Sequence, residues 1–111
     1  MLVENFINEK IGQLVYFLDG LLNNAVHYTE VETFIWDCFE EWNQLNVTDD
    51  TPGSSKERVF WHLIHEIQIS SLASVQDNSE LQTEIKTCLD FLKDKTSYPK
   101  HCVGWRPVAA F

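Results

Sequence analysis

Hydrophobic residues recur every three or four positions in four separate stretches of this chain, the spacing that puts them on one side of an α-helix. The clearest stretch is 29–45, where a single apolar stripe is formed by Val31, Phe34, Ile35, Cys38, Phe39, Trp42 and Leu45. Thr29 and Glu32 have the spacing of a capping box, in which a hydroxyl and a carboxylate each pair with a free backbone N–H of the first turn. We therefore expect this helix to begin at Thr29.

A second stretch with the same spacing predicts a helix over residues 3–22. Gly12 and Gly20 each weaken it by about 1 kcal/mol relative to Ala, which leaves a break near 8–12 open. The connection to the next helix is only a few residues long, so the two helices should be antiparallel neighbours.

The third and fourth helices follow a segment rich in turn-forming residues. Ser54 and Glu57 form a second capping box, and the stripe after them leaves the end of the third helix undecided as far as 72–75. Ser79 and Gln82 have the same capping spacing at the start of the fourth helix.

These patterns predict an all-α fold, with one domain over residues 1–111. We expect an antiparallel bundle of about four helices over 1–95 and an irregular apolar tail over 96–111 packed on it. The expected core consists of Phe6, Ile7, Leu14, Leu18, Phe34, Ile35, Phe39, Trp42, Phe60, Leu63, Ile64, Ile67, Leu81, Ile85, Leu89 and Leu92.

The tail has no helical period but is rich in large apolar residues. Each such side chain would cost about 1.5 to 3 kcal/mol to leave in water, so we expect the tail to fold back over the bundle. The residues concerned are Tyr98, Val103, Trp105, Val108 and Phe111.

Composition is that of a globular chain that needs neither disulfides nor metal to fold, with 44% apolar and 23% charged residues over 111 positions. The odd number of cysteines, Cys38, Cys88 and Cys102, favours buried free thiols in a reducing compartment. No long apolar run and no basic leader are present, so we expect a cytoplasmic protein without a membrane segment.

Charge is distributed unevenly. Residues 1–50 contain ten Asp or Glu and one Lys, a net charge of -9, whereas residues 51–111 contain seven of each sign. Phosphate backbones attract clustered Lys and Arg, so direct nucleic-acid binding is disfavoured and a basic protein is the natural partner. The alternative is that the acidic surface only keeps the protein soluble.

The acidic residues concentrate on the polar side of the 29–45 helix. The candidate partner-binding residues are Glu30, Glu32, Trp36, Asp37, Glu40 and Glu41. Trp36 falls among carboxylates on the helical wheel, so it is either part of a wider buried stripe or an exposed anchor for a partner. Trp61 raises the same question on the third helix.

Catalytic and metal-binding patterns are weak. His62 and His65 lie three apart with Glu66 after the second, which does not match the HExxH arrangement of a helical zinc site. The adjacent pair His101 and Cys102 rarely present both groups to one substrate. Phosphate-binding glycine loops and GxSxG are absent from the sequence, so we expect no enzyme activity, no cofactor and no metal.

The order of segments resembles that of the immunity proteins of colicin D type and of contact-dependent inhibition. The matching parts are LVENFINEKI, TEVETFIWDCFEEW, ERVFWHLIHEI and SELQTEIKTCLDFLKD, which together span most of residues 2–95, while the tail is additional to the pattern. The resemblance implies inhibition of a basic tRNA-cleaving toxin, whose active-site cleft would be covered by Glu30, Glu32, Asp37, Glu40 and Glu41.

Three functions are therefore in competition. The first is an immunity protein or antitoxin that covers the cleft of a basic nuclease. The second is a phage-type inhibitor that mimics the charge of nucleic acid, and the third is a helical scaffold or oligomerisation module that uses an apolar face. Charge-steered association should weaken as salt rises, whereas apolar self-association should survive.

Overall fold

A computed structural model describes residues 2–49, 51–99 and 104–107 of the chain. The described residues are all-helical, with short connections between the helices. The helices are α1 (Leu2–Leu22), α2 (Tyr28–Gln44), α3 (Ser55–Ile69), α4 (Leu72–Asp77) and α5 (Ser79–Leu92). Within this part of the chain, no helix combines the length and the apolar character needed to cross a membrane.

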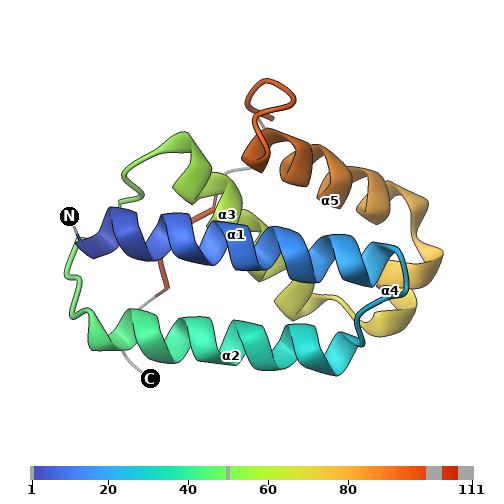
Figure 1. Cartoon of the computed structure of the whole chain (residues 1–111), viewed down its shortest axis with the longest axis horizontal. Coiled ribbons are helices and arrows are strands. Elements are labelled where there is room, and N and C mark those ends of the chain that lie inside the picture. The colour runs from blue at the N-terminus through green and yellow to red at the C-terminus, as the bar shows by residue number, and fades with distance from the viewer. Residues whose placement is uncertain (1, 50, 100–103, 108–111) are drawn as a thin grey trace.

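The helices form a bundle in which α1 is central (Figure 1). α2 runs antiparallel to α1 along one side, as the short connection predicts, and α5 lies on the other side. α3 crosses behind α1 and packs against α1, α2 and α5, while the short α4 packs on α5 at one end. The prediction of a small helical bundle is confirmed, with α4 as an additional short helix.

The core consists of the apolar stripes of these helices, as the spacing predicts. Every expected core residue is buried except Phe6, which is half-buried against the Trp42 ring at 5.7 Å between centroids. Cys38 and Cys88 are fully buried and form no disulfide, in agreement with a structural role, whereas Cys102 lies outside the described residues. Trp61 is also a core residue, with only 2% of its surface exposed.

The predicted helix starts are partly wrong. α2 begins at Tyr28, and the carboxylate of Glu30, not that of Glu32, accepts from the backbone N–H of His27 at 2.9 Å. α5 is capped by Asn78, whose side chain accepts from the Leu81 N–H at 3.1 Å. The cap of α2 thus lies two residues before the expected Thr29, and the cap of α5 lies one residue before the expected Ser79, because other side chains reach the free N–H groups at these helix starts.

The third helix ends at Ile69, which settles its undecided length. The Tyr28 hydroxyl of α2 lies 3.1 Å from the Ile67 carbonyl and 2.7 Å from the Ser70 carbonyl, so it can donate a hydrogen bond to the end of the helix. Ser70 is extended, and Ser71 then caps α4 by accepting from the Ser74 N–H at 3.1 Å. The break between α3 and α4 is thus fixed by a tertiary contact and a new cap.

Residues 104–107 of the tail dock on α3 through polar groups. Arg106 forms a two-pronged ion pair with the buried Glu57, at 2.5 Å to Oε2 and 2.9 Å to Oε1. Glu57 also accepts from the Trp61 indole N–H at 3.0 Å and from the Gly53 N–H at 2.9 Å. We call these four residues the Glu57–Arg106 network.

Further contacts hold the docked segment, among them a hydrogen bond of 2.9 Å from the Arg106 guanidinium to the Asp49 carbonyl. The Gly104 N–H donates to the Arg58 carbonyl at 3.0 Å, and a Cβ at Gly104 would clash with the His62 backbone nitrogen. The Arg106 guanidinium lies over the Trp42 ring at 5.5 Å. Docking of this segment therefore depends on a glycine at position 104, which has no side chain, and on the positive charge of Arg106.

The expectation that large apolar side chains hold the tail is only partly met. Tyr98 is half-buried against Phe91, at 5.5 Å between ring centroids. Trp105, by contrast, is 67% exposed because the flanking residues Gly104 and Arg106 make the contacts with the bundle. Val103, Val108 and Phe111 lie outside the described residues.

Candidate protein-binding surface

The six candidate residues all lie on α2, but the structure distributes them over two sides of this helix. The apolar stripe of α2 faces the core, which leaves a broad outer surface exposed. Glu32 and Trp36 face a hollow toward α3, whereas Glu30, Asp37 and Glu41 face a groove toward α1. Glu40 is exposed one turn after Trp36.

Glu32, Trp36 and Glu40 follow one another at intervals of four residues, and we call this row the α2 crest. The Trp36 side chain is 68% exposed, which identifies it as a surface residue and not as part of a wider buried stripe. Among the described residues, neither Glu32 nor Glu40 takes part in an ion pair or a side-chain hydrogen bond. The crest thus presents an indole between two unpaired carboxylates.

A hollow of about 170 Å³ lies beside Trp36, between α2 and the end of α3. Its wall is partly aromatic, and its lining residues are Tyr28, Glu32, Ile35, Trp36, Phe39, Ile67, Gln68 and Ser70. Burial first, and then the nearby Glu32 carboxylate, raise the pKa of the Tyr28 hydroxyl, so this group stays protonated and keeps its bonds to the end of α3. The hydrogen bond from Tyr28 therefore holds α2 and the end of α3 together on the side of the hollow where Tyr28 lies.

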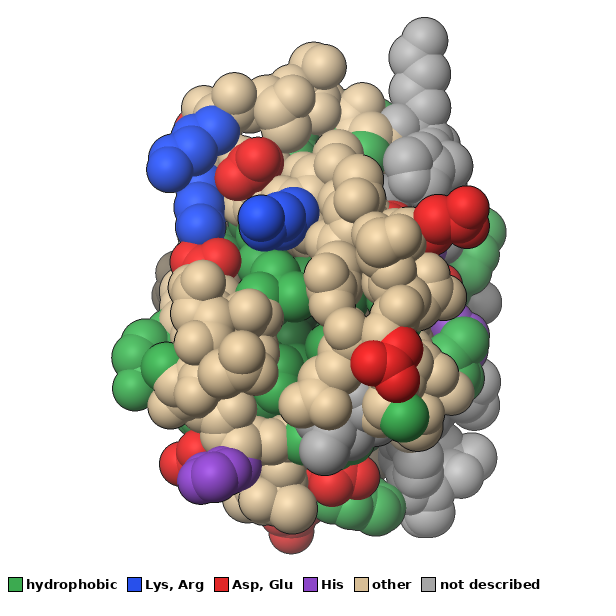
Figure 2. All heavy atoms as spheres, turned by 90° about the vertical axis from the view of Figure 1, so that its right-hand side faces the viewer, with side chains coloured by type: hydrophobic (Ala, Val, Ile, Leu, Met, Phe, Trp, Pro, Cys, Tyr) green, Lys and Arg blue, Asp and Glu red, His purple; other side chains and the backbone are tan. Residues whose placement is uncertain are grey.

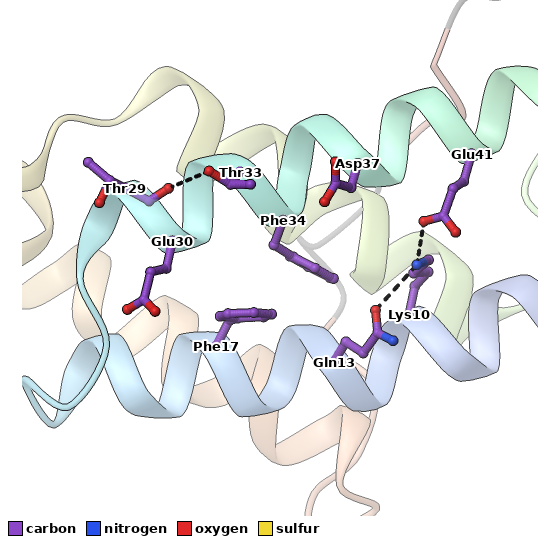
Figure 3. A pocket seen from close by; sticks show the side chains of 9 residues that line it. All are labelled: Lys10, Gln13, Phe17, Thr29, Glu30, Thr33, Phe34, Asp37 and Glu41. Carbon is purple, nitrogen blue, oxygen red and sulfur yellow. Dashed lines mark hydrogen bonds and ion pairs between the residues drawn. The ribbon is translucent and has the colours of Figure 1, made fainter.

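The larger opening is the α1/α2 groove, with a volume of about 620 Å³ (Figure 3). Phe17 of α1 and Phe34 of α2 stack at 4.9 Å between ring centroids and lie between the two helices. Its lining residues are Lys10, Gln13, Phe17, Thr29, Glu30, Thr33, Phe34, Asp37 and Glu41. The groove thus combines an aromatic surface with an acidic margin.

One end of this groove contains a buried cation. Lys10 is only 6% exposed, and its ammonium group lies 2.5 Å from the Glu41 carboxylate and 3.3 Å from the Gln13 side-chain oxygen (Figure 3). Lys10 is also the single cation of the acidic half of the sequence. Glu41 is therefore already neutralised within the protein, unlike the carboxylates of the α2 crest.

Asp37 is the carboxylate of the groove that remains available. Glu30 accepts the His27 N–H and Glu41 pairs with Lys10, whereas Asp37 is exposed and takes part in no ion pair within the described part of the chain. A cation placed over an aromatic face and next to a carboxylate is attracted by both. The groove is therefore suited to a planar cation such as a guanidinium.

Cys38 lies beneath this surface without chemical activity. Burial raises the pKa of its thiol to about 12, with Lys10 opposing the rise and Glu41 and Asp37 adding to it. Since the thiolate is the reactive form, Cys38 is a packing residue at neutral pH.

Figure 2 shows the end of the molecule where α4 lies, and on this face the Lys and Arg side chains lie away from α2. In the described part of this face, Lys and Arg side chains gather toward α5, and the Asp and Glu side chains are spread more widely. Lys93, the C-cap residue of α5, pairs with Asp19 of α1 at 2.6 Å. The α2 side of the protein thus keeps its acidic character.

The histidines singled out in the sequence do not form one site. His65 is exposed, whereas His62 is half-buried near Glu66 and Glu84, the one group among the described residues that could hold a metal ion. His101 and Cys102 lie outside the described residues. The sequence pattern gave no sign of Glu84, because it comes from another helix.

Comparisons of the chain with protein-family models, with curated proteins and with solved structures give no match. The resemblance to immunity proteins therefore stays a prediction from the order of segments. A function must be inferred from the surface of α2 and from the charges around it.

Proposed function

We propose that this chain is a small acidic binding protein that neutralises a basic protein, in the manner of an immunity protein or antitoxin. The observation that carries the proposal is the α2 crest, where an exposed indole lies between two carboxylates that have no partner in the described residues. Tryptophan is enriched among the residues that dominate binding energies, and flanking carboxylates attract and orient a basic surface.

The α1/α2 groove supplies a second contact in this proposal. An arginine of the partner would lie against the half-buried Phe17 ring and pair with Asp37, while Lys10 and Glu41 close the end of the groove. The crest and the groove lie on the same helix, so one basic surface can reach both.

The basic partner that fits best is a nuclease. Such an enzyme holds phosphates with clustered Lys and Arg, and the unpaired carboxylates of α2 would occupy the same cations. Inhibition would then be steric and electrostatic and would need no chemistry from this chain.

The test is a pull-down from the native cell with tagged protein, followed by an assay of the captured protein for cleavage of RNA. We expect one basic protein, inhibited when the two chains are present in equal amounts. Trp36→Ala should reduce capture by tenfold or more, because hot-spot truncations cost about 2 kcal/mol or more. Tyr16→Ala is the matched control, since Tyr16 is an equally exposed aromatic on α1.

Two outcomes would contradict the proposal. Equal capture by the wild type and the Trp36→Ala variant would remove the crest from the interface. A captured protein without nuclease activity would leave the crest as a binding surface but would reject the antitoxin assignment.

A further inference from the structure

A half-buried cluster of metal-ligating side chains lies between α3 and α5, a different pair of helices from the groove. Its members are His62 and Glu66 of α3 and Glu84 of α5. One ligand atom from each residue lies within 4.8 Å of the other two, and the His62 Nε2 atom is 2.7 Å from the Glu84 Oε1 atom. The side chains of His62 and Glu84 are only 13% and 28% exposed.

The backbone around the cluster is held in place. His62 and Glu66 are one helical turn apart, so their side chains lie on the same side of α3. The α3 and α5 helices pack directly against each other, with Leu63 and Ile85 both fully buried. On the other side, the Gly104 backbone lies against α3 at His62, where a Cβ would not fit.

We infer that His62, Glu66 and Glu84 form a binding site for a divalent first-row transition metal, with zinc as the ion it takes. Zinc is bound by histidine nitrogen at about 2.0 to 2.1 Å and by carboxylate oxygen at about 2.0 to 2.2 Å, so the ligand atoms of a tetrahedral site lie about 3.3 Å apart. Small side-chain rotations bring a cluster that already lies within 4.8 Å to this separation.

The ligand set also explains the choice of ion. Two carboxylates balance the charge of a divalent cation, and an imidazole nitrogen favours zinc and its neighbours over magnesium and calcium, which prefer oxygen alone. His62 would give the Nε2 lone pair to the metal and carry its proton on Nδ1, and water would complete the tetrahedron. The ion would join α3 to α5 and stabilise the bundle.

The test starts from the full chain stripped of metal with a chelator. Zinc chloride is added while heat release and melting temperature are measured, and cobalt chloride is added separately to record the visible absorption of the bound ion. We expect one zinc ion per chain, a higher melting temperature, and a cobalt spectrum of four- or five-coordinate nitrogen and oxygen ligands.

Three variants and one control assign the site. His62→Ala, Glu66→Gln and Glu84→Gln should each weaken zinc binding by tenfold or more and reduce the rise in melting temperature. His65→Ala, which removes an exposed histidine from the same helix, should bind zinc like the wild type. Glu66→Gln keeps the size of the side chain and leaves the His62–Glu84 contact intact, so it should fold even if the other two variants do not.

Zinc binding that is unchanged in the Glu66→Gln variant would place the ion elsewhere in the chain and overturn the assignment. So would a wild type whose melting temperature and heat release do not respond to zinc. Magnesium chloride should give no response, and an equal response to magnesium would reject a site built on the imidazole.

Discussion

The α2 crest and the Glu57–Arg106 network place carboxylates in opposite situations. Glu57 is 3% exposed, and Arg106, Gly53 and Trp61 all donate to it. Glu32 and Glu40 are exposed and have no partner among the described residues. The first carboxylate is used inside the protein to hold the tail, whereas the other two are free to meet another molecule.

Trp61 of α3 and Trp36 of α2 follow the same division. Trp61 is buried and gives its N–H to Glu57, so its aromatic surface and its polar atom are both used within the fold. Trp36 leaves most of its surface in water. Exposure of this apolar surface costs free energy, and contacts within the chain do not offset it. This difference is what separates a stability residue from a candidate binding residue.

The largest expected effect on stability comes from Arg106→Ala. This change leaves the Glu57 carboxylate buried without its cation, and breaking a buried pair in this way costs about 3 to 5 kcal/mol. Denaturant unfolding measures the loss. Glu40→Ala, on the crest, should stay within about 0.5 kcal/mol of the wild type, and an equal loss in both variants would remove the distinction between the two regions.

The Glu57–Arg106 network should also make the free energy of unfolding depend on pH in the acid range. Burial alone would raise the pKa of Glu57, but hydrogen bonds from Arg106, Gly53 and Trp61, together with the Arg106 charge, lower it below its ordinary value of 4.5. Because the folded pKa is lower than the unfolded one, the stabilisation is present above pH 4.5 and is lost as pH falls below that value.

The variant Glu57→Gln should therefore unfold with a weaker dependence on pH below about 4.5 than the wild type does. Unfolding free energy measured in steps of pH gives the two slopes. Glu40→Gln serves as the control and should follow the wild-type slope. A Glu57→Gln curve parallel to that of the wild type would show that the network does not set the acid response.

A smaller loss of stability is expected at the Lys10–Glu41 pair, because Glu41 is less buried than Glu57 but, unlike the unpaired carboxylates of the α2 crest, pairs with a buried cation. Glu41→Ala leaves a buried ammonium with Gln13 as its remaining side-chain partner, but Glu41 itself is about half exposed to solvent, so the loss should be about 1 kcal/mol. Glu40→Ala is again the comparison. If the two neighbouring variants unfolded at the same denaturant concentration, Lys10 would not depend on Glu41.

The sequence was sufficient for the helices and their buried faces because both follow from a local period. The stripe from Phe34 to Trp42 is buried as predicted, and α1 continues through Gly12 without a break. Cap positions were less certain because several polar side chains near a helix start can reach the same N–H groups. The observed pair of His27 and Glu30 lies two residues before the expected pair of Thr29 and Glu32, and Asn78 lies one residue before the expected Ser79.

The sequence could not reveal contacts between distant residues. Arg106 and Glu57 are 49 positions apart, and His62 and Glu84 are 22 apart, so no local spacing connects them. The wheel placed Trp36 among carboxylates correctly, but it could not show that α1 supplies Lys10 to neutralise Glu41. Of the six candidate residues, the structure therefore makes Glu41 the least available.

The most direct measurement of the central claim is the binding of the captured basic partner to two charge-reversal variants. The first, Glu32→Lys with Glu40→Lys, reverses the α2 crest. The second, Glu80→Lys with Asp90→Lys, changes two exposed carboxylates of α5 and alters the net charge equally. Association and dissociation rates are recorded for both variants and the wild type at low and high salt.

We predict that reversal of the crest weakens binding by tenfold or more at low salt, chiefly through slower association, and that the difference narrows as salt rises. The α5 variant should lose much less, because its charges lie away from α2. Equal losses in the two variants would show that net charge alone matters, and unchanged binding in the crest variant would contradict the claim that α2 is the partner surface.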